Sequence, residues 1–240
     1  MRPILSAALP AALVLAGCWA GPAKVRDAAE AVDRAAPIPD PARVAPGLVA
    51  LPCAEDGALR PVLRGYCVGQ RHYVTRRAKA ALEDAAEAMA RRFPGAQVQF
   101  MEASWPEGRR PMPPHLSHGD GRQIDITLFY VDLKGRPLPR PPTLNGYGAN
   151  EPPRREVERA CRGGRTTKND RSDPPRDRRW RLDEARTREL VRLLADDPRV
   201  RRVFIEPHLK TRLGFSRHPK VRFAGCAAAR HDDHLHVDFR

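Results

Sequence analysis

The chain has 240 residues, enough for one domain with a substantial core and a tail. Its 43 Lys and Arg residues against 29 Asp and Glu residues give a net charge of +14 and a pI near 10.4, which implies a polyanionic neighbour. The mean hydropathy of −0.56 excludes a protein with several membrane-spanning segments.

The first 18 residues have the form of an export signal. Arg2 is followed by a short apolar run that cannot span a bilayer as a permanent helix. The run ends in Leu15-Ala16-Gly17-Cys18, which resembles the lipobox of bacterial lipoproteins. We expect Cys18 to receive lipid, and the alternative is a plain cleaved signal. Trp19 is not the aspartate that retains lipoproteins at the inner membrane, which favours a periplasmic protein anchored to the outer membrane.

Residues 19–50 are rich in Ala and Pro and lack a steady apolar period. This composition suits a tether between a lipid anchor and a folded domain. We therefore expect a signal peptide at 1–18, a tether at 19–50 and a single folded domain at 51–240.

Four cysteines remain after the lipobox, and an even number in an exported chain indicates disulfides. Three pairings are possible. We expect Cys53–Cys67 and Cys161–Cys226, because the first pair is local in sequence. A cysteine-rich zinc site is the alternative, and these spacings fit it poorly.

Apolar residues recur at steps of three and four between residues 75 and 92, which predicts an amphipathic helix. Thr75 is a suitable N-cap, and Pro94-Gly95 ends the helix. Residues 98–103 then alternate as a strand.

The next stretch, residues 114–125, contains two histidines, two glycines and two aspartates, and it precedes an alternating apolar run at 124–130. This run predicts a strand that carries Asp125. A carboxylate on a buried strand is costly unless it is paired or binds a metal. The two glycines let the preceding loop fold back, so His118 is expected to meet Asp125.

Residues 132–181 read as an extended loop region with a turn at 145–148. Between Arg154 and Arg181 there are eleven Lys or Arg residues against five Asp or Glu residues. Such a run is either a solvated insertion or a surface that docks an anionic polymer, and the two readings remain open.

A second helix is predicted from its N-cap Asp183 to Ala195, followed by a strand at 202–206. His208 and His218 are read as ordinary structural or surface residues. Two helices and several strands without repeating βαβ units indicate the α+β class, with helices packed on a largely antiparallel sheet.

The chain ends in an alternating run, 234–239, that predicts a strand with His234 and His236 on the same face. Two histidines and one aspartate are a common set of ligands for catalytic zinc, with the fourth position left for water. Combined with the motif at 114–125, this run predicts a Zn²⁺ site, and solvated histidines are the alternative.

The two motifs resemble those of the zinc peptidases that include lysostaphin-type enzymes, D-Ala-D-Ala peptidases and the hedgehog fold. The closer similarity is to penicillin-insensitive murein endopeptidases, which carry a His-x2-His-x6-Asp segment and a terminal His-Asp-Asp-His-x-His. The similarity runs from about residue 60 to the end of the chain. It implies a hedgehog or D-Ala-D-Ala-peptidase type of fold.

The resemblance also implies the roles of individual residues. The metal ligands would be His118, Asp125 and His236, and His234 would serve catalysis. His115 and His231 match the additional active-site histidines of the family. The implied substrate is peptidoglycan, cleaved at D-Ala–meso-diaminopimelate cross-links.

In such a site a zinc-activated water would attack the peptide carbonyl, and His234 would move a proton to the leaving amine. His231 would orient His234 or stabilise the oxyanion. A non-catalytic zinc-stabilised lipoprotein that binds the cell wall is one rival reading, and the presence of His234 beside the ligands argues against it. An exported nucleic-acid-binding protein or nuclease is the other, but aromatic residues form only 6% of the chain, few for stacking on bases, so no nucleic acid is expected as a partner.

Overall fold

The computed structural model describes residues 44–109, 111–113, 115–155, 161 and 178–240. The predictions for the signal peptide and Cys18 lie outside the described residues, as do those for most of the tether and most of the basic segment after Arg154.

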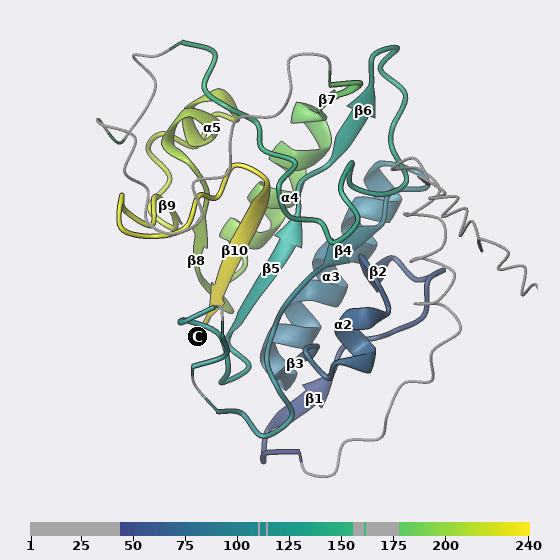
Figure 1. Cartoon of the computed structure of the whole chain (residues 1–240), viewed down its shortest axis with the longest axis vertical. Coiled ribbons are helices and arrows are strands. Elements are labelled where there is room, and N and C mark those ends of the chain that lie inside the picture. Colours follow the sequence, from purple (N-terminus) through teal and green to yellow (C-terminus); the bar gives the residue numbers. More distant parts are fainter. Residues whose placement is uncertain (1–43, 110, 114, 156–160, 162–177) are drawn as a thin grey trace, which may run out of the picture.

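A six-stranded sheet in the order β2-β4-β5-β10-β8-β9 forms the centre of the molecule (Figure 1). The inner pairings β4–β5, β5–β10 and β10–β8 are antiparallel, whereas β2–β4 and β8–β9 at the two edges are parallel. The strands are β2 (Leu59–Pro61), β4 (Val98–Phe100), β5 (Gln123–Thr127), β8 (Val200–Phe204), β9 (Val221–Arg222) and β10 (His234–Phe239).

Two further antiparallel pairs lie outside this sheet. The first joins β1 (Leu48–Ala50) to β3 (Tyr73–Thr75), and the second joins β6 (Tyr130–Asp132) to β7 (Trp180–Leu182). Residues 48–50 therefore belong to the folded part, although the tether was predicted to extend to residue 50. Leu48 is buried and each residue of β1 has a pairing partner in β3.

The helices are α2 (Gly65–Val68), α3 (Arg76–Arg92), α4 (Glu184–Asp196) and α5 (Pro207–Arg212). Both predicted N-caps are confirmed, because Thr75 accepts a hydrogen bond from the backbone N–H of Ala78 and Asp183 accepts one from Arg186. The helices α3 and α4 contact each other and lie behind the central strands in Figure 1. The α+β class predicted from the sequence agrees with this arrangement.

The two faces of the central strands differ in polarity. Alternate residues of β5 and β10 are apolar and join α3 and α4 in one core, which includes Ile124, Ile126, Leu235, Val237, Leu82 and Leu190. The residues between them, including Asp125 and His236, face the other side. The helices therefore cover the apolar face, and the polar face carries the residues of both sequence motifs.

The strand predicted at 124–130 is interrupted. Its partner β10 begins at His234, which lies opposite Thr127, so no ladder continues beyond that point. Phe129 instead accepts from the backbone N–H of Asp183 and donates to the Thr187 hydroxyl, and the strand resumes as β6.

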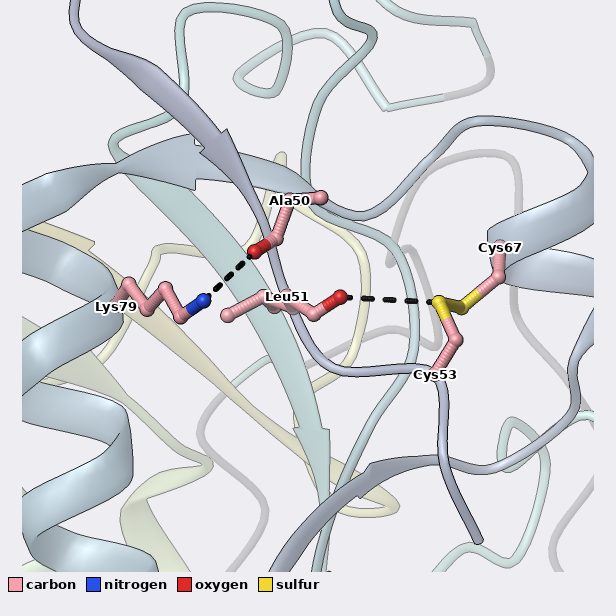
Figure 2. The surroundings of a disulfide bond; sticks show 5 residues. All are labelled: Ala50, Leu51, Cys53, Cys67 and Lys79. Atoms are coloured by element: carbon pink, nitrogen blue, oxygen red, sulfur yellow. Dashed lines mark hydrogen bonds between the residues drawn. A yellow bond between two sulfur atoms is a disulfide. The ribbon is translucent and has the colours of Figure 1, made fainter. Parts of the chain in front are cut away.

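Both predicted disulfides are present. Cys53–Cys67 closes a separation of 14 residues and Cys161–Cys226 one of 65 residues. Sγ of Cys53 lies 3.7 Å from the Leu51 carbonyl oxygen (Figure 2), a simple contact because a disulfide sulfur has no proton to donate. The Lys79 ammonium of α3 donates to the Ala50 carbonyl in the same region, so the chain after β1 is held from two sides.

Within the described residues, no helix is both long and apolar enough to cross a membrane.

Candidate metal centre

Three side chains of the two sequence motifs converge on one point of the polar face. Asp125 on β5 and His236 on β10 lie directly opposite each other in the antiparallel ladder. His236 Nδ1 is 2.9 Å from Asp125 Oδ1 and 3.1 Å from His118 Nε2, and the remaining pair, His118 Nε2 and Asp125 Oδ1, is 3.3 Å apart. The three atoms form a compact triangle.

The size of this triangle fits a small metal ion. A tetrahedral ion with ligand bonds of about 2.0–2.1 Å places its ligand atoms about 3.3 Å apart. His118 and Asp125 are fully buried and His236 is 8% exposed, so the three polar groups are withdrawn from water. Two imidazoles and one carboxylate that converge in this way can hold a metal ion.

The backbone fixes which nitrogen of His118 is available. Its Nδ1 atom is 3.0 Å from the carbonyl oxygen of Ala103, which can only accept a hydrogen bond. Nδ1 therefore carries the proton, and the lone pair of Nε2 points into the triangle. This second contact orients the ring in the way typical of metal-binding histidines.

The backbone of Asp125 is held equally firmly. Its N–H donates to Glu102 and its carbonyl accepts from Met101, which are the residues just beyond the end of β4. Burial alone would raise the pKa of the carboxyl, but the adjacent imidazoles of His118 and His234 outweigh it and hold that pKa well below its ordinary value. The carboxylate is thus charged where a cation would bind.

His234 lies beside the triangle with its Nε2 atom 3.8 Å from Asp125 Oδ1. Its Nδ1 atom is 2.5 Å from the carboxylate of Asp233. Burial lowers the pKa of His234, but the negative charges of Asp233 and Asp125 outweigh this effect and raise the pKa to about 9. His234 and Asp233 are arranged like a proton-transfer histidine and the carboxylate that orients it.

His115 lies beside the second carboxylate oxygen of Asp125, Oδ2. Its Nδ1 atom is 3.4 Å from Asp125 Oδ2, and its Nε2 atom is 2.5 Å from Glu102, which also binds the Arg71 guanidinium. His115, His118 and Asp125 form a second group whose ligand atoms lie within 4.8 Å of one another. The triangle with His236 has sides of only 2.9–3.3 Å and is the more compact of the two groups, so it is the better candidate.

His231 is buried next to both C-terminal histidines, with ring centroids 4.9 Å from His234 and 5.7 Å from His236. Its backbone N–H donates to the Glu206 carboxylate, and its Nδ1 atom has no hydrogen-bond partner among the described residues. Burial lowers the pKa of His231 to about 3, and the neighbouring imidazoles act in the same direction. The ring is therefore a neutral wall of the site.

One more group of potential ligands consists of Cys53, Cys67 and His72. The two sulfur atoms are joined in a disulfide and carry no thiolate that would bind a metal. The predicted preference for disulfides over a cysteine-rich zinc site agrees with this geometry.

Three residues that contact the site were not predicted from the sequence: Glu102, Tyr147 and Asp233. Asp233 stands directly before His234, so the adjacency was a usable signal. Glu102 ends a predicted strand and Tyr147 stands between two glycines in a predicted turn. Neither position indicates contact with a residue more than twenty positions away.

Comparison with known proteins adds no further assignment. No protein-family model matches the chain, and no curated protein matches its sequence significantly.

Proposed function

We propose that the protein is a zinc-dependent murein endopeptidase that hydrolyses the peptide cross-links of peptidoglycan. The observation that carries the proposal is the triangle of His118 Nε2, Asp125 Oδ1 and His236 Nδ1, whose sides measure 2.9–3.3 Å. His234 lies directly beside it, where a proton-transfer group is needed.

The donor set favours zinc. Two imidazole nitrogens and one carboxylate oxygen are borderline and hard ligands, which together suit Zn²⁺ in a site with one open position. The site carries no cysteine thiolate, which softer ions prefer. The preference for zinc is therefore inferred from the three ligand atoms of His118, Asp125 and His236.

When bound, zinc would lower the pKa of a bound water and polarise the carbonyl of the scissile bond. His234 donates a proton from Nε2 to the leaving amine, and Asp233 holds the opposite nitrogen, Nδ1, so that the ring keeps its orientation. His231 excludes water from one side of the site. His115, which is held by Glu102, lies beside Oδ2 of Asp125, the carboxylate oxygen outside the triangle.

The substrate comes from the resemblance of the motifs to penicillin-insensitive murein endopeptidases. The resemblance of the motifs also leads us to propose a fold of the hedgehog and D-Ala-D-Ala peptidase type, and the placement of Asp125 and His236 on adjacent antiparallel strands supports this proposal. The net charge of +14 agrees with an anionic cell wall as neighbour. D-Ala–meso-diaminopimelate cross-links are the proposed bonds.

The proposed location is the periplasm, with the protein anchored to the outer membrane through lipid on Cys18. Two disulfides in the described residues support an oxidising compartment. Labelling with a lipid precursor, comparing the wild type with Cys18→Ser, tests the anchor. A wild-type protein that carries no lipid would contradict it.

Incubation of the purified protein with intact sacculi, followed by separation of the released muropeptides, tests the activity. We expect cross-linked dimers to be converted to monomers, loss of this conversion with a chelator, and recovery with Zn²⁺. His218→Ala is the matched control, since His218 lies outside both motifs and pairs with Asp196 on α4. A protein that binds zinc and sacculi but releases no monomers would instead be the non-catalytic wall-binding lipoprotein.

A further inference from the structure

The segment 145–149 contacts both halves of the candidate metal centre. The Tyr147 hydroxyl donates to Asp125 Oδ2 at 2.7 Å, on the β5 side of the site. The next residue, Gly148, donates its backbone N–H to the carboxylate of Asp233, which holds His234 on the β10 side. The Tyr147 ring also meets His234 edge to face, with centroids 5.1 Å apart.

The two oxygens of Asp125 therefore have different surroundings. Oδ1 faces the two ligand nitrogens, whereas Oδ2 accepts the hydroxyl hydrogen bond of Tyr147. His115 Nδ1 also approaches Oδ2, but at 3.4 Å, which is longer than a normal hydrogen bond. The phenolic hydroxyl is thus the closest donor to the outer oxygen.

We propose that Tyr147 is a positioning residue that keeps Asp125 bound to the metal through Oδ1 alone. A carboxylate with both oxygens free can rotate or chelate a metal through both. A donor fixed at Oδ2 opposes both movements, which preserves the open coordination position that a water needs. Hydrogen bonds to ligating side chains typically strengthen metal affinity 10–100-fold.

The local backbone explains how Tyr147 reaches this place. Gly146 has a φ of +87°, and a Cβ atom there would lie 2.3 Å from Met101 Sδ and 3.1 Å from Thr127 Cγ2. The turn therefore needs glycine for both its conformation and its close approach to the sheet. The Tyr66 hydroxyl donates to the Asn145 carbonyl at 2.6 Å and anchors the same turn from α2.

The inference rests on the metal site of the proposed function, but it is independent of the substrate. The comparison is between Tyr147→Phe, which removes the hydroxyl that donates to Asp125, and Tyr66→Phe, which removes the hydroxyl that donates to the Asn145 carbonyl of the same turn. Both variants lose one phenolic oxygen. A loss specific to Tyr147→Phe separates positioning of the ligand from general loosening of the turn.

Zinc affinity is measured by competition with a chromogenic chelator, and coordination by the visible absorption of the Co²⁺-loaded protein. We expect Tyr147→Phe to bind zinc 10–100-fold more weakly than the wild type and to show weaker Co²⁺ bands, as expected for a higher coordination number. Tyr66→Phe should retain the affinity and spectrum of the wild type.

Equal zinc affinities and Co²⁺ spectra for the wild type and Tyr147→Phe would overturn the inference, and so would an equal loss in Tyr66→Phe. A wild type that binds one zinc but cleaves no cross-link would contradict the proposed function and leave the role of Tyr147 intact. A wild type that takes up neither Zn²⁺ nor Co²⁺ would overturn both.

Discussion

His236 and Asp125 face each other across the antiparallel pair β5–β10, and Nδ1 of the histidine lies 2.9 Å from Oδ1 of the aspartate. The two residues are 111 positions apart in the chain, yet the ladder fixes their separation. His118 completes the triangle from the loop before β5, and its ring is oriented by the hydrogen bond to the Ala103 carbonyl. Two of the three ligand atoms are therefore set by strand register and the third by a loop.

The two disulfides are expected to differ in their effect on stability. Replacing both Cys161 and Cys226 with Ala should lower the free energy of unfolding by about 4 kcal/mol, because the bridge closes a long loop. The corresponding change at Cys53 and Cys67 should lower it by about 3 kcal/mol. Urea denaturation under non-reducing conditions measures both, and a larger loss for the shorter loop would contradict the expectation.

Gly121 is expected to be essential for the geometry of the first motif. Its φ is +77°, and an added Cβ would lie 2.3 Å from Leu48 Cδ2 and 3.0 Å from the Thr75 backbone nitrogen. Gly121→Ala should lower the free energy of unfolding by about 2–4 kcal/mol, through backbone strain and overpacking together.

Gly135→Ala is the matched control for this change. Gly135 has a similar φ of +81°, but nothing lies within 4 Å of a Cβ built there. Only the backbone cost of about 1–2 kcal/mol is expected. Thermal or urea unfolding compares the two variants, and equal losses would show that the contact with β1 and β3 is unimportant.

His72 is expected to make the stability pH-dependent. Burial lowers the pKa of His72 to about 4 in the folded protein, although a hydrogen bond to the backbone of Tyr66 opposes this shift; the ordinary pKa is 6.5. Between these values the unfolded chain binds more protons than the folded one, so the free energy of unfolding falls as the pH is lowered from 6.5 to 4. The contribution is on the order of 3 kcal/mol.

Urea denaturation at several pH values tests this expectation in the wild type and in His72→Gln. The variant lacks the titrating ring, so its stability should fall less steeply over the same pH interval. The difference between the two pH profiles is the quantity of interest, because other groups titrate in both proteins. Parallel profiles would show that His72 does not carry the effect.

Sequence periodicity was sufficient for the elements that bury one face. The helices α3 and α4 and the strand β10 have a repeating apolar pattern and, for the helices, capping residues, so local chemistry determines them. The edge strands β2 and β9 are only three and two residues long and have no period to detect. Their pairing is a consequence of the tertiary structure.

The residues of the site also divide into those whose contacts could be predicted from local sequence and those whose contacts depend on tertiary packing. Strand alternation brought His234 and His236 to one face, and the short spacing between His118 and Asp125 made their contact foreseeable. Tyr147 and Glu102 reach the site through loop paths that depend on Gly146 packing against the sheet and on the backbone pairing beyond β4. Such contacts follow from packing and not from local sequence.

His234 and His236 lie on the same strand face but are expected to have different roles. His236→Ala should lose the metal and the activity together, since its Nδ1 atom is one corner of the triangle. His234→Ala should keep its zinc while cross-link hydrolysis falls about 10²–10⁴-fold, the typical contribution of general acid–base catalysis.

The measurement is zinc per chain by elemental analysis of both variants, read beside release of monomeric muropeptides from sacculi. We expect close to one zinc per chain in His234→Ala and almost none in His236→Ala, with both variants inactive. Zinc retained in His236→Ala and lost in His234→Ala would contradict it.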